Sequence, residues 1–355
     1  MRTSISISIL INNFNYGRYL GAAIDSALAQ AATLQRAGAG AEVEVIVCDD
    51  ASTDDSREVM ARCGTRIQTW HSPENRGQAS AMNAGLALSR GEWVLFLDSD
   101  DLLDPDALAT CLPLMQDGVA KIQFQLQCIT QDGHPMGRQI PYLLHDGDVR
   151  PLVKQFGTYG GPPSSGNLYR RSAIARYFPL DEPSWRRAAD TPPFLLSAFN
   201  GRVVSAPRPL GSYRIHSSAN RTRGCFGNIS ARHGDMLRIE AHRRTTSLAL
   251  LARVDGIDIP NPPLHAPWNL RSRALSLRTE PERHPYPTDT AASLLRMQAD
   301  ALAACPGYTW FEQRAAQVWL AAVLLVPTAW ATRMAISNTS GRIRRWFREL
   351  RAHLA

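Results

Sequence analysis

Short apolar runs alternate with stretches of helical spacing over the first 115 residues. The apolar runs that predict buried strands are residues 4–11, 43–50, 66–70 and 92–101. The stretches whose apolar residues recur with helical spacing are residues 19–34, 54–63, 77–91 and 104–115. This alternation predicts an α/β fold in which a mostly parallel sheet lies between crossover helices.

The pattern changes further along the chain. Strands are predicted at 120–129 and 202–207, and a short helix at 190–201. Beyond about residue 220 no strand is predicted. The helical patterns that remain are 229–253, 289–305 and 310–333, and a proline-rich stretch at 260–287 separates the first from the other two. We therefore predict an α/β domain at 1–222 and a helical region at 223–355.

Composition narrows the class of protein. With 355 residues and 44% hydrophobic content, the chain can bury the cores of two units. Its net charge is +7, which would suit nucleic acid, anionic lipid or phosphorylated substrates. The arginines lack the aromatic interleaving of a nucleic-acid surface, so no nucleic-acid partner is expected. The six scattered cysteines form no metal-binding motif, and the N-terminus has no signal-peptide pattern, so a reduced, cytoplasmic chain is expected.

Acidic and amide residues follow three of the predicted strands. These polar strand ends are "NNFN" (12–15), "DDASTDD" (49–55) and "DSDD" (98–101). The carboxyl ends of parallel strands meet at one edge of a sheet, where ligands bind. Crowded carboxylates there would suit Mg²⁺ or Mn²⁺, which prefer oxygen ligands and take further ones from phosphate. The pattern predicts a divalent cation that carries a diphosphate, although a D-x-D motif by itself also occurs in acidic surface loops.

Residues 4–220 resemble a family 2 glycosyltransferase with the inverting GT-A fold. The matching blocks, in family order, are "SISILINNFNYGRYLGAAIDSALAQ" (6–30), "VEVIVCDDASTDDS" (43–56), "NRGQASAMNAGLALSRGEWVLFLDSDD" (75–101) and "LLDPDAL" (102–108). The resemblance implies an enzyme that moves a sugar from a nucleotide-diphosphate donor to a hydroxyl acceptor, which is a sugar or a lipid-linked molecule. Synthesis of a bacterial surface polysaccharide or glycolipid is the implied setting.

The resemblance also implies roles for individual residues. Asp50 would bind the nucleotide base, and Asn12 and Asn15 would line the same pocket. The family's metal-binding motif falls on Asp98, near the ribose and the metal, and on Asp100, which would bind the metal directly.

Two later blocks carry further roles. "AADTPPF" (188–194) resembles the block with the family's catalytic base, which places that role on Asp190. "YRIHSSANR" (213–221) resembles the block that closes over the diphosphate, with His216 as a metal or phosphate contact. Asp190 could instead cap a helix, and His216 could be structural. "SSGNLYRRSAI" (164–174) looks like the segment that lines the sugar and acceptor cleft.

Some positions depart from the family pattern. The family commonly has Glu at the position of Ala189, Arg at that of Met82 and Thr at that of Asn12. The change at Ala189 leaves room for an alternative, a catalytically silent sugar-nucleotide-binding or membrane scaffold. A nucleotidyltransferase would need a Gly-rich phosphate loop after the first strand, and "NNFNYGRYL" does not supply one.

The C-terminal end has two patterns typical of membrane contact. Residues 315–332 carry no charge, but they are marginal for a membrane span of about 20 residues and contain Pro327. In 341–355, "GRIRRWFRELRAHLA", apolar residues share one helical face and arginines occupy the other, as in an interfacial helix on anionic lipid. Peripheral attachment to the inner face of the cytoplasmic membrane is one interpretation. Packing of these residues on the catalytic domain is the other.

Overall fold

The computed structural model describes residues 5–216, 225–226, 229–230, 232–260 and 263–331. The chain forms two compact units. The first comprises the residues up to Val153, Tyr159–Arg214 and Thr246–Pro260, and the second comprises Lys154–Thr158, Ile215–Thr245 and the residues from Asn261 onward. The chain therefore crosses between the units several times, and the predicted boundary at residue 222 stays a prediction.

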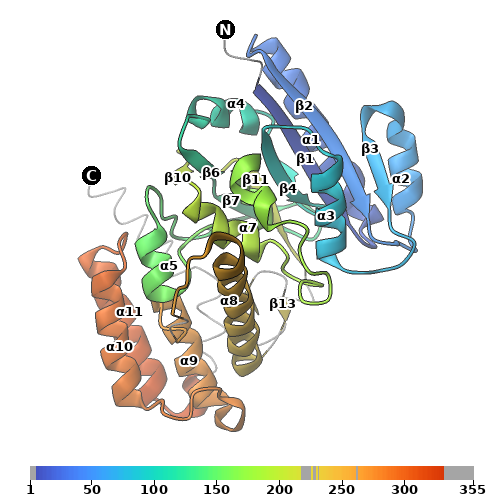
Figure 1. Ribbon diagram of the computed structural model, residues 1–355. Helices are drawn as coiled ribbons and strands as arrows, with labels where there is room; N and C mark the ends of the chain where they lie inside the picture. Colours follow the sequence, from blue (N-terminus) through green and yellow to red (C-terminus); the bar gives the residue numbers. More distant parts are fainter. Residues whose placement is uncertain (1–4, 217–224, 227–228, 231, 261–262, 332–355) are drawn as a thin grey trace. The chain divides into compact units, whose positions relative to one another are not determined.

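A seven-stranded sheet forms the centre of the first unit (Figure 1). Its strands, in spatial order, are β10 (Arg202–Ser205), β6 (Val119–Gln123), β9 (Asn167–Arg170), β4 (Trp93–Asp98), β1 (Ile5–Asn13), β2 (Ala41–Asp49) and β3 (Gln68–His71). Neighbouring strands are parallel except at β9, which is antiparallel to both β4 and β6. The prediction of a mostly parallel sheet is confirmed.

Helices surround this sheet and bury the apolar side chains that its central strands carry on both faces. Residues Ile9–Ile11 of β1 and Val94–Leu97 of β4 are almost completely buried, as is usual for strands covered on both sides. The helices of the first part of the chain are α1 (Gly17–Arg36), α2 (Ser56–Cys63), α3 (Gln78–Leu88), α4 (Ala107–Cys111), α5 (Arg150–Phe156), α6 (Arg171–Ile174) and α7 (Thr191–Leu196).

A smaller four-stranded sheet was only partly predicted. Its strands, in spatial order, are β5 (Leu102–Leu103), β11 (Gly211–Ile215), β7 (Leu126–Thr130) and β8 (Pro135–Ile140). The single strand predicted at 120–129 is in fact two strands in different sheets, β6 and β7, and the chain changes sheet at Phe124 and Gln125. Phe124 N–H donates to the Gly166 carbonyl (2.9 Å) at this crossing, so the interruption leaves no buried donor unpaired.

The C-terminal region is helical, as predicted. It contains α8 (His233–Asp255), α9 (Pro267–Thr279), α10 (Ala291–Ala304) and α11 (Trp310–Leu325). The last three pack against one another within the second unit. Helices α10 and α11 each begin with a capping box, formed by Thr290 with Ser293 and by Thr309 with Glu312.

Two predictions for this region are wrong. Strands do occur beyond residue 220, since β12 (Cys225–Phe226) pairs with β13 (Ile229–Ser230). The proline-rich stretch 260–287 contains the thirteen-residue helix α9. Its prolines cluster before and after the helix, and Pro267 occupies the first helical position, where the missing N–H costs nothing.

Two further observations bear on the sequence predictions. Five cysteines, Cys48, Cys63, Cys111, Cys128 and Cys305, are buried free thiols. Within the described ranges, no helix combines the length and the apolar character needed to cross a membrane. The predicted interfacial helix at 341–355 lies outside the described residues.

Candidate active site

The carboxyl ends of β1, β2 and β4 lie at one edge of the large sheet. In the strand ladder Asn12 is level with Cys48 on one side and with Asp98 on the other. Asp50 follows β2, and its N–H donates to the Asn13 carbonyl (2.9 Å). The strand register thus brings Asn12, Asp50 and Asp98 together at this edge.

Three carboxylates follow β4 within four positions. Burial, and then the charges of Asp100 and Asp190, raise the pKa of Asp98 well above its ordinary value. Burial, and then the charges of Asp100 and Asp98, likewise raise the pKa of Asp101. Asp190 therefore lies within electrostatic reach of Asp98, although 92 residues separate them in sequence. The roles of Asp190 as base and of Asp98 as metal ligand stay predictions.

Asp101 has a structural role that the other two carboxylates do not share. Its side chain is fully buried and accepts hydrogen bonds from Ser165 Oγ (2.6 Å) and from the Arg214 backbone N–H (2.9 Å). The same Ser165 hydroxyl accepts a bond from the Asp98 N–H (3.1 Å), and Arg214 Nε donates to the Asp100 carbonyl (2.8 Å). Ser165 and Arg214 therefore hold the backbone that carries Asp98 and Asp100.

The guanidinium of Arg214 is buried and donates hydrogen bonds to backbone carbonyls. Besides Asp100 it donates to the Gln131 carbonyl (3.0 Å), and it lies 4.7 Å from the centre of the Tyr19 ring. Tyr16 lies 5.8 Å from the same ring. Burial, and then the charges of Asp100 and Asp98, raise the pKa of the Tyr16 phenol to about 12. Tyr16 thus faces the carboxylates as a neutral hydroxyl.

The predicted nucleotide-binding residues differ in the hydrogen bonds that their side chains make within the protein. The Asp50 carboxylate accepts from the N–H groups of Arg76 (3.0 Å) and Gly77 (2.6 Å), and so holds the start of α3. Asn15 has a left-handed φ of 55°, and its side-chain oxygen accepts from the Thr53 N–H (2.8 Å). By contrast, both polar side-chain atoms of Asn12 are buried and have no hydrogen-bond partner among the described residues.

Asp190 immediately precedes α7 but makes no side-chain capping bond. Its position depends on segment 185–189, which is tied to the start of α3. Gln78 N–H donates to the Arg186 carbonyl (3.0 Å), and Ala79 N–H to that of Trp185 (3.2 Å). The Ala189 N–H in turn donates to Gln78 Oε1 (3.0 Å). The capping role considered for Asp190 therefore has no support in this geometry.

The outcome for His216 is different. It follows β11 by one residue and belongs to the second unit, whereas the residues described above belong to the first. The rest of its predicted block, 217–221, lies outside the described residues. Its role as a metal or phosphate contact stays a prediction.

The acidic edge fits a divalent cation that is held by few protein groups. Within the described part of the chain, no three His, Cys, Asp or Glu side chains are grouped so that they alone could hold a metal ion. Asp101 is bonded to Ser165 and Arg214, and the assignment of Asp98 and Asp100 to a metal stays a prediction. Burial and then the charge of Asp100 raise the pKa of Asp98, and a cation at this edge would offset both effects. The amide of Asn12, which has no partner among the described residues, offers a ligand a further polar contact.

Sequence reasoning did not identify several residues of this edge. In the sequence, Asp101 is recognised only as the third carboxylate of "DSDD". Ser165 and Arg214 lie within sequence blocks that resemble the family, but no role was assigned to either residue. Asp49 was also missed. It is fully buried and accepts from Asn13 Nδ2 (2.8 Å), Ser52 Oγ (2.5 Å) and the Ser52 N–H (3.1 Å). The bonds from Ser52 to Asp49 are local, whereas Asn13 reaches Asp49 only through the pairing of β1 with β2, which no local pattern predicts.

Comparison with known proteins gives a consistent result. Residues 8–178 match the family model described as glycosyl transferase family 2. An uncharacterized glycosyltransferase of Nostoc sp. is 34% identical over 224 residues, covering 61% of this chain and 66% of the relative. Chondroitin synthase of Pasteurella multocida is 37% identical over 109 residues, which are 30% of this chain and 10% of the synthase. The chain thus spans less than two thirds of either relative.

The fold has a counterpart among solved structures. The crystal structure of S. aureus TarS 1–349 in complex with UDP-GlcNAc superposes with a TM-score of 0.52 at 14% identity. The match covers 96% of this chain and 92% of the TarS chain. At this identity the likeness concerns the fold, which is of the GT-A type.

Proposed function

The chain belongs to glycosyl transferase family 2, and on that premise we propose that it transfers a sugar from a nucleotide-diphosphate donor to a hydroxyl acceptor with inversion at the anomeric carbon. One observation carries the proposal beyond family membership. Burial and the charge of Asp100 raise the pKa of Asp98, and the charge of Asp190 adds to this rise, so a candidate base lies within electrostatic reach of a candidate metal carboxylate. That juxtaposition suits a displacement reaction, which needs a base on one side of the sugar and charge stabilisation on the other.

In this proposal Asp98 and Asp100 would hold Mg²⁺ or Mn²⁺, with His216 as a further contact. The bound metal would stabilise the negative charge that develops on the departing nucleoside diphosphate. Asn12 would use its unpaired amide to orient the nucleotide, and Asn15 and Asp50 would shape the same pocket. Ser165 and Arg214 would keep Asp98 and Asp100 in place while the donor enters.

Asp190 would accept the proton of the attacking hydroxyl. A hydroxyl is a weak nucleophile until a base removes its proton, and such a base contributes about 10²–10⁴ in rate. A carboxylate that is not occupied in capping α7 is suited to this role. Tyr16, whose raised pKa keeps it protonated at neutral pH, could donate a hydrogen bond to oxygen atoms at this edge but could not serve as the base.

The substrate class is proposed from the relatives. Chondroitin synthase is by name a polysaccharide-building enzyme, and the TarS structure is a complex with a nucleotide sugar. We infer a nucleotide sugar as donor and a sugar or lipid-linked acceptor in bacterial surface polysaccharide or glycolipid synthesis. Peripheral contact of residues 341–355 with an anionic membrane remains part of the proposal.

The test uses thermal unfolding and transfer together. A panel of nucleotide sugars is screened with and without Mn²⁺, because a ligand that binds only the native state raises the melting temperature. Asp100→Asn should lose the metal-dependent shift. Asp190→Asn should keep the shift and lose transfer by about 10²–10⁴-fold.

Asp181→Asn is the matched control, since Asp181 is an exposed carboxylate in the same part of the chain that accepts from Ser184. Normal turnover in Asp190→Asn would place the base elsewhere. Donor binding by the wild type without transfer or donor hydrolysis would favour the silent scaffold.

A further inference from the structure

Helix α11 is apolar on two opposite faces. One face is packed, and Leu320, Val323 and Leu324 on it are at most 4% exposed. The opposite face carries Phe311, Val318 and Leu325, which are spaced seven residues apart and are 71%, 68% and 73% exposed. A helix that is apolar all round is normally buried or in contact with lipid. The structure therefore leaves one apolar face of α11 without a protein partner in the described chain.

This exposed face, defined by Phe311, Val318 and Leu325, also carries the exposed Arg314 between Phe311 and Val318, and it is flanked by tryptophans. Helical spacing places Ala315 and Ala322 between the three large side chains. Trp310 at the start of the helix is 61% exposed, and Trp330 just beyond its end is 59% exposed. The sequence from residue 315 to 331 contains no charged residue. Exposed apolar surface of this extent usually marks an interaction site.

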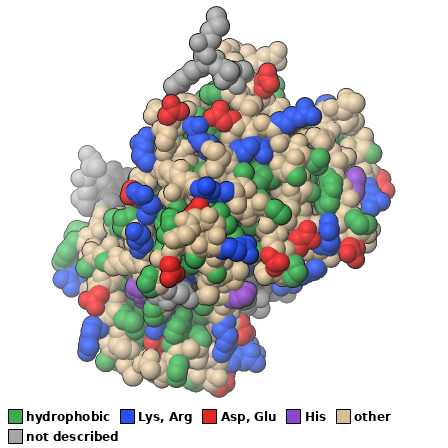
Figure 2. All heavy atoms as spheres, viewed as in Figure 1, with side chains coloured by type: hydrophobic (Ala, Val, Ile, Leu, Met, Phe, Trp, Pro, Cys, Tyr) green, Lys and Arg blue, Asp and Glu red, His purple; other side chains and the backbone are tan. Residues whose placement is uncertain are grey.

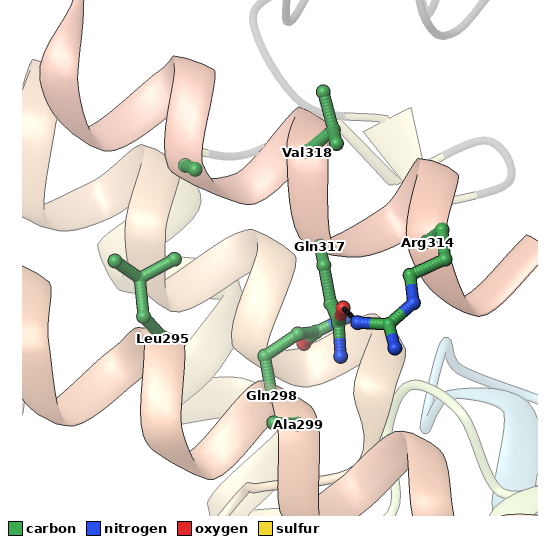
Figure 3. A pocket seen from close by; sticks show the side chains of 7 residues that line it. Leu295, Gln298, Ala299, Arg314, Gln317 and Val318 are labelled. Carbon is green, nitrogen blue, oxygen red and sulfur yellow. Dashed lines mark hydrogen bonds between the residues drawn. The ribbon is translucent and has the colours of Figure 1, made fainter.

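A groove of about 440 Å³ runs beside the exposed face, between α10 and α11 (Figure 3). Leu295 and Ala299 of α10 and Val318 and Ala321 of α11 form its apolar walls. Gln298, also in the lining, is 1% exposed, and its amide nitrogen and oxygen have no hydrogen-bond partner among the described residues. The groove is therefore apolar along its walls, and the amide of Gln298 lies buried beneath it.

The polar lining of the groove includes a positive charge. Arg314 Nη1 donates to Gln317 Oε1 (3.1 Å), and both residues line the groove. Figure 2 shows hydrophobic side chains next to basic ones on the surface of the helical C-terminal region. An apolar chain along the walls and an anionic group at Arg314 would match this chemistry, and that combination is found in a phospholipid.

We propose that the exposed face of α11 docks on an anionic lipid bilayer, with Phe311, Val318 and Leu325 at headgroup depth and a lipid chain in the groove. Tryptophans such as Trp310 and Trp330 are enriched at the membrane–water interface. The inference uses residues that play no part in the proposed transfer reaction.

The positive charge of the C-terminal residues favours an anionic bilayer over a second copy of the chain as the partner of this face. Residues 332–355, which follow directly, contain six arginines and one glutamate, a formal charge of +5 out of +7 for the chain. Two copies of the chain, each with this positive charge, would repel each other. An anionic leaflet would attract them, and each basic residue near such a surface adds to the binding.

The experiment measures co-sedimentation of the full chain with vesicles, without donor or metal. Vesicles of phosphatidylcholine with phosphatidylglycerol are compared with vesicles of phosphatidylcholine alone. The double variant Val318→Gln, Leu325→Gln should bind the anionic vesicles at least about tenfold more weakly. Binding of this variant no longer transfers two large apolar side chains from water into the bilayer. Arg314→Gln should reduce the preference for phosphatidylglycerol.

The matched control is Ala292→Gln, Ala303→Gln, which introduces the same amides at exposed positions of α10. Circular dichroism checks that both double variants keep the wild-type helix content. Equal vesicle binding by the two double variants would overturn the proposal. So would a wild type that ignores vesicles but self-associates in a way that Val318→Gln, Leu325→Gln abolishes, which would assign the face to a second copy.

Discussion

The side chains at the acidic edge fall into two groups. Some hold the backbone in place through hydrogen bonds, and others could contact a ligand. Asp101, Ser165 and Arg214 bond to one another or to the loop after β4. Asp98 carries a raised pKa instead, and Asn12 an unpaired amide. A site of this kind is destabilising until its ligand arrives, which is the usual condition of functional positions.

Ser165→Ala tests the holding role. The change removes the hydroxyl that joins the Asp98 N–H to the Asp101 carboxylate and leaves two buried groups short of a partner. We expect the free energy of unfolding to fall by about 1–3 kcal/mol, and the divalent ion concentration for half-maximal transfer to rise. Denaturant unfolding and metal titration of activity measure the two effects.

Ser164 provides the control for this change. It is the adjacent buried serine, and its hydroxyl makes a long bond to the Phe96 carbonyl (3.3 Å). Ser164→Ala should leave the metal requirement unchanged. An equal rise of that requirement in both variants would refute a specific role for Ser165.

Lys121 is a buried charged residue whose desolvation costs free energy. Its Nζ donates to Asn167 Oδ1 (2.9 Å) and lies 4.1 Å from the centre of the Phe194 ring, and the side chain is fully buried. Burial lowers the pKa of Lys121 well below its ordinary value of 10.5. Between the lowered pKa and 10.5 the unfolded chain binds a proton that the folded chain has released, so stability rises with pH across that window.

Lys121→Met should remove this rise. Urea unfolding of wild type and variant at about pH 7 and about pH 9 gives the difference between their free energies of unfolding. That difference should shift in favour of the wild type at the higher pH. A difference that stays constant would mean that Lys121 titrates alike in the folded and unfolded chain.

At the scale of elements, the contact between the start of α3 and segment 185–189 positions α7 and Asp190. Gly77 precedes α3 with φ of +96°, and a Cβ there would lie 2.6 Å from Arg186 Cα and 2.7 Å from its carbonyl oxygen. The close approach permits the bonds from Gln78 and Ala79 to segment 185–189. Two elements far apart in sequence therefore depend on one small residue.

Gly77→Ala should move segment 185–189 away from α3. We expect a loss of about 1–3 kcal/mol in the free energy of unfolding and a larger fall in kcat than in donor affinity, because Asp190 is displaced. Gly38→Ala is the control for backbone strain alone, since Gly38 has φ of +61° with no atom within 4 Å of the added Cβ. Equal kinetic effects in both variants would contradict the assigned contact.

At the scale of the molecule, the second unit has a polar core of its own. Arg273 Nε donates to Asp289 (2.9 Å), and both residues are nearly inaccessible to solvent. His284 Nε2 lies 3.0 Å from the same carboxylate, and Arg273 lies 4.0 Å from the centre of the Tyr286 ring. Burial raises the pKa of Asp289, but the bonds from His284 and Arg273 outweigh it and lower the pKa overall.

Arg273→Leu should destabilise the second unit by about 3–5 kcal/mol, because it leaves a buried carboxylate without its main partner. The stabilisation of the first unit by nucleotide and Mn²⁺ should persist. Calorimetry with and without these ligands measures both, and Arg296→Leu, on an exposed position of α10, is the control. Loss of the ligand-dependent stabilisation in Arg273→Leu would show that the donor site needs the second unit intact.

The order of elements at the N-terminal end was predictable because local periodicity determines it. The strands β1, β2 and β4 each contain a buried apolar run, and the polar residues at their carboxyl ends mark where they end. Since parallel strands end at one edge, the meeting of Asn12, Asp50 and Asp98 followed from the pattern alone. The two short strands β12 and β13 and helix α9 escaped prediction because short segments and flanking prolines carry weak local signals.

Other features were decided only by the tertiary structure. The sequence by itself determined the fold class, the acidic edge and the identity of the carboxylates that could act there. It could not determine that Asp101 is bonded to Ser165 and Arg214 or that the charge of Asp190 acts on Asp98, since each interaction joins residues more than sixty positions apart. Nor could it show which face of α11 is packed, because both faces are apolar and only the placement of α9 and α10 distinguishes them. Periodicity is a local property of the chain, whereas the partner of a buried group depends on how distant segments meet.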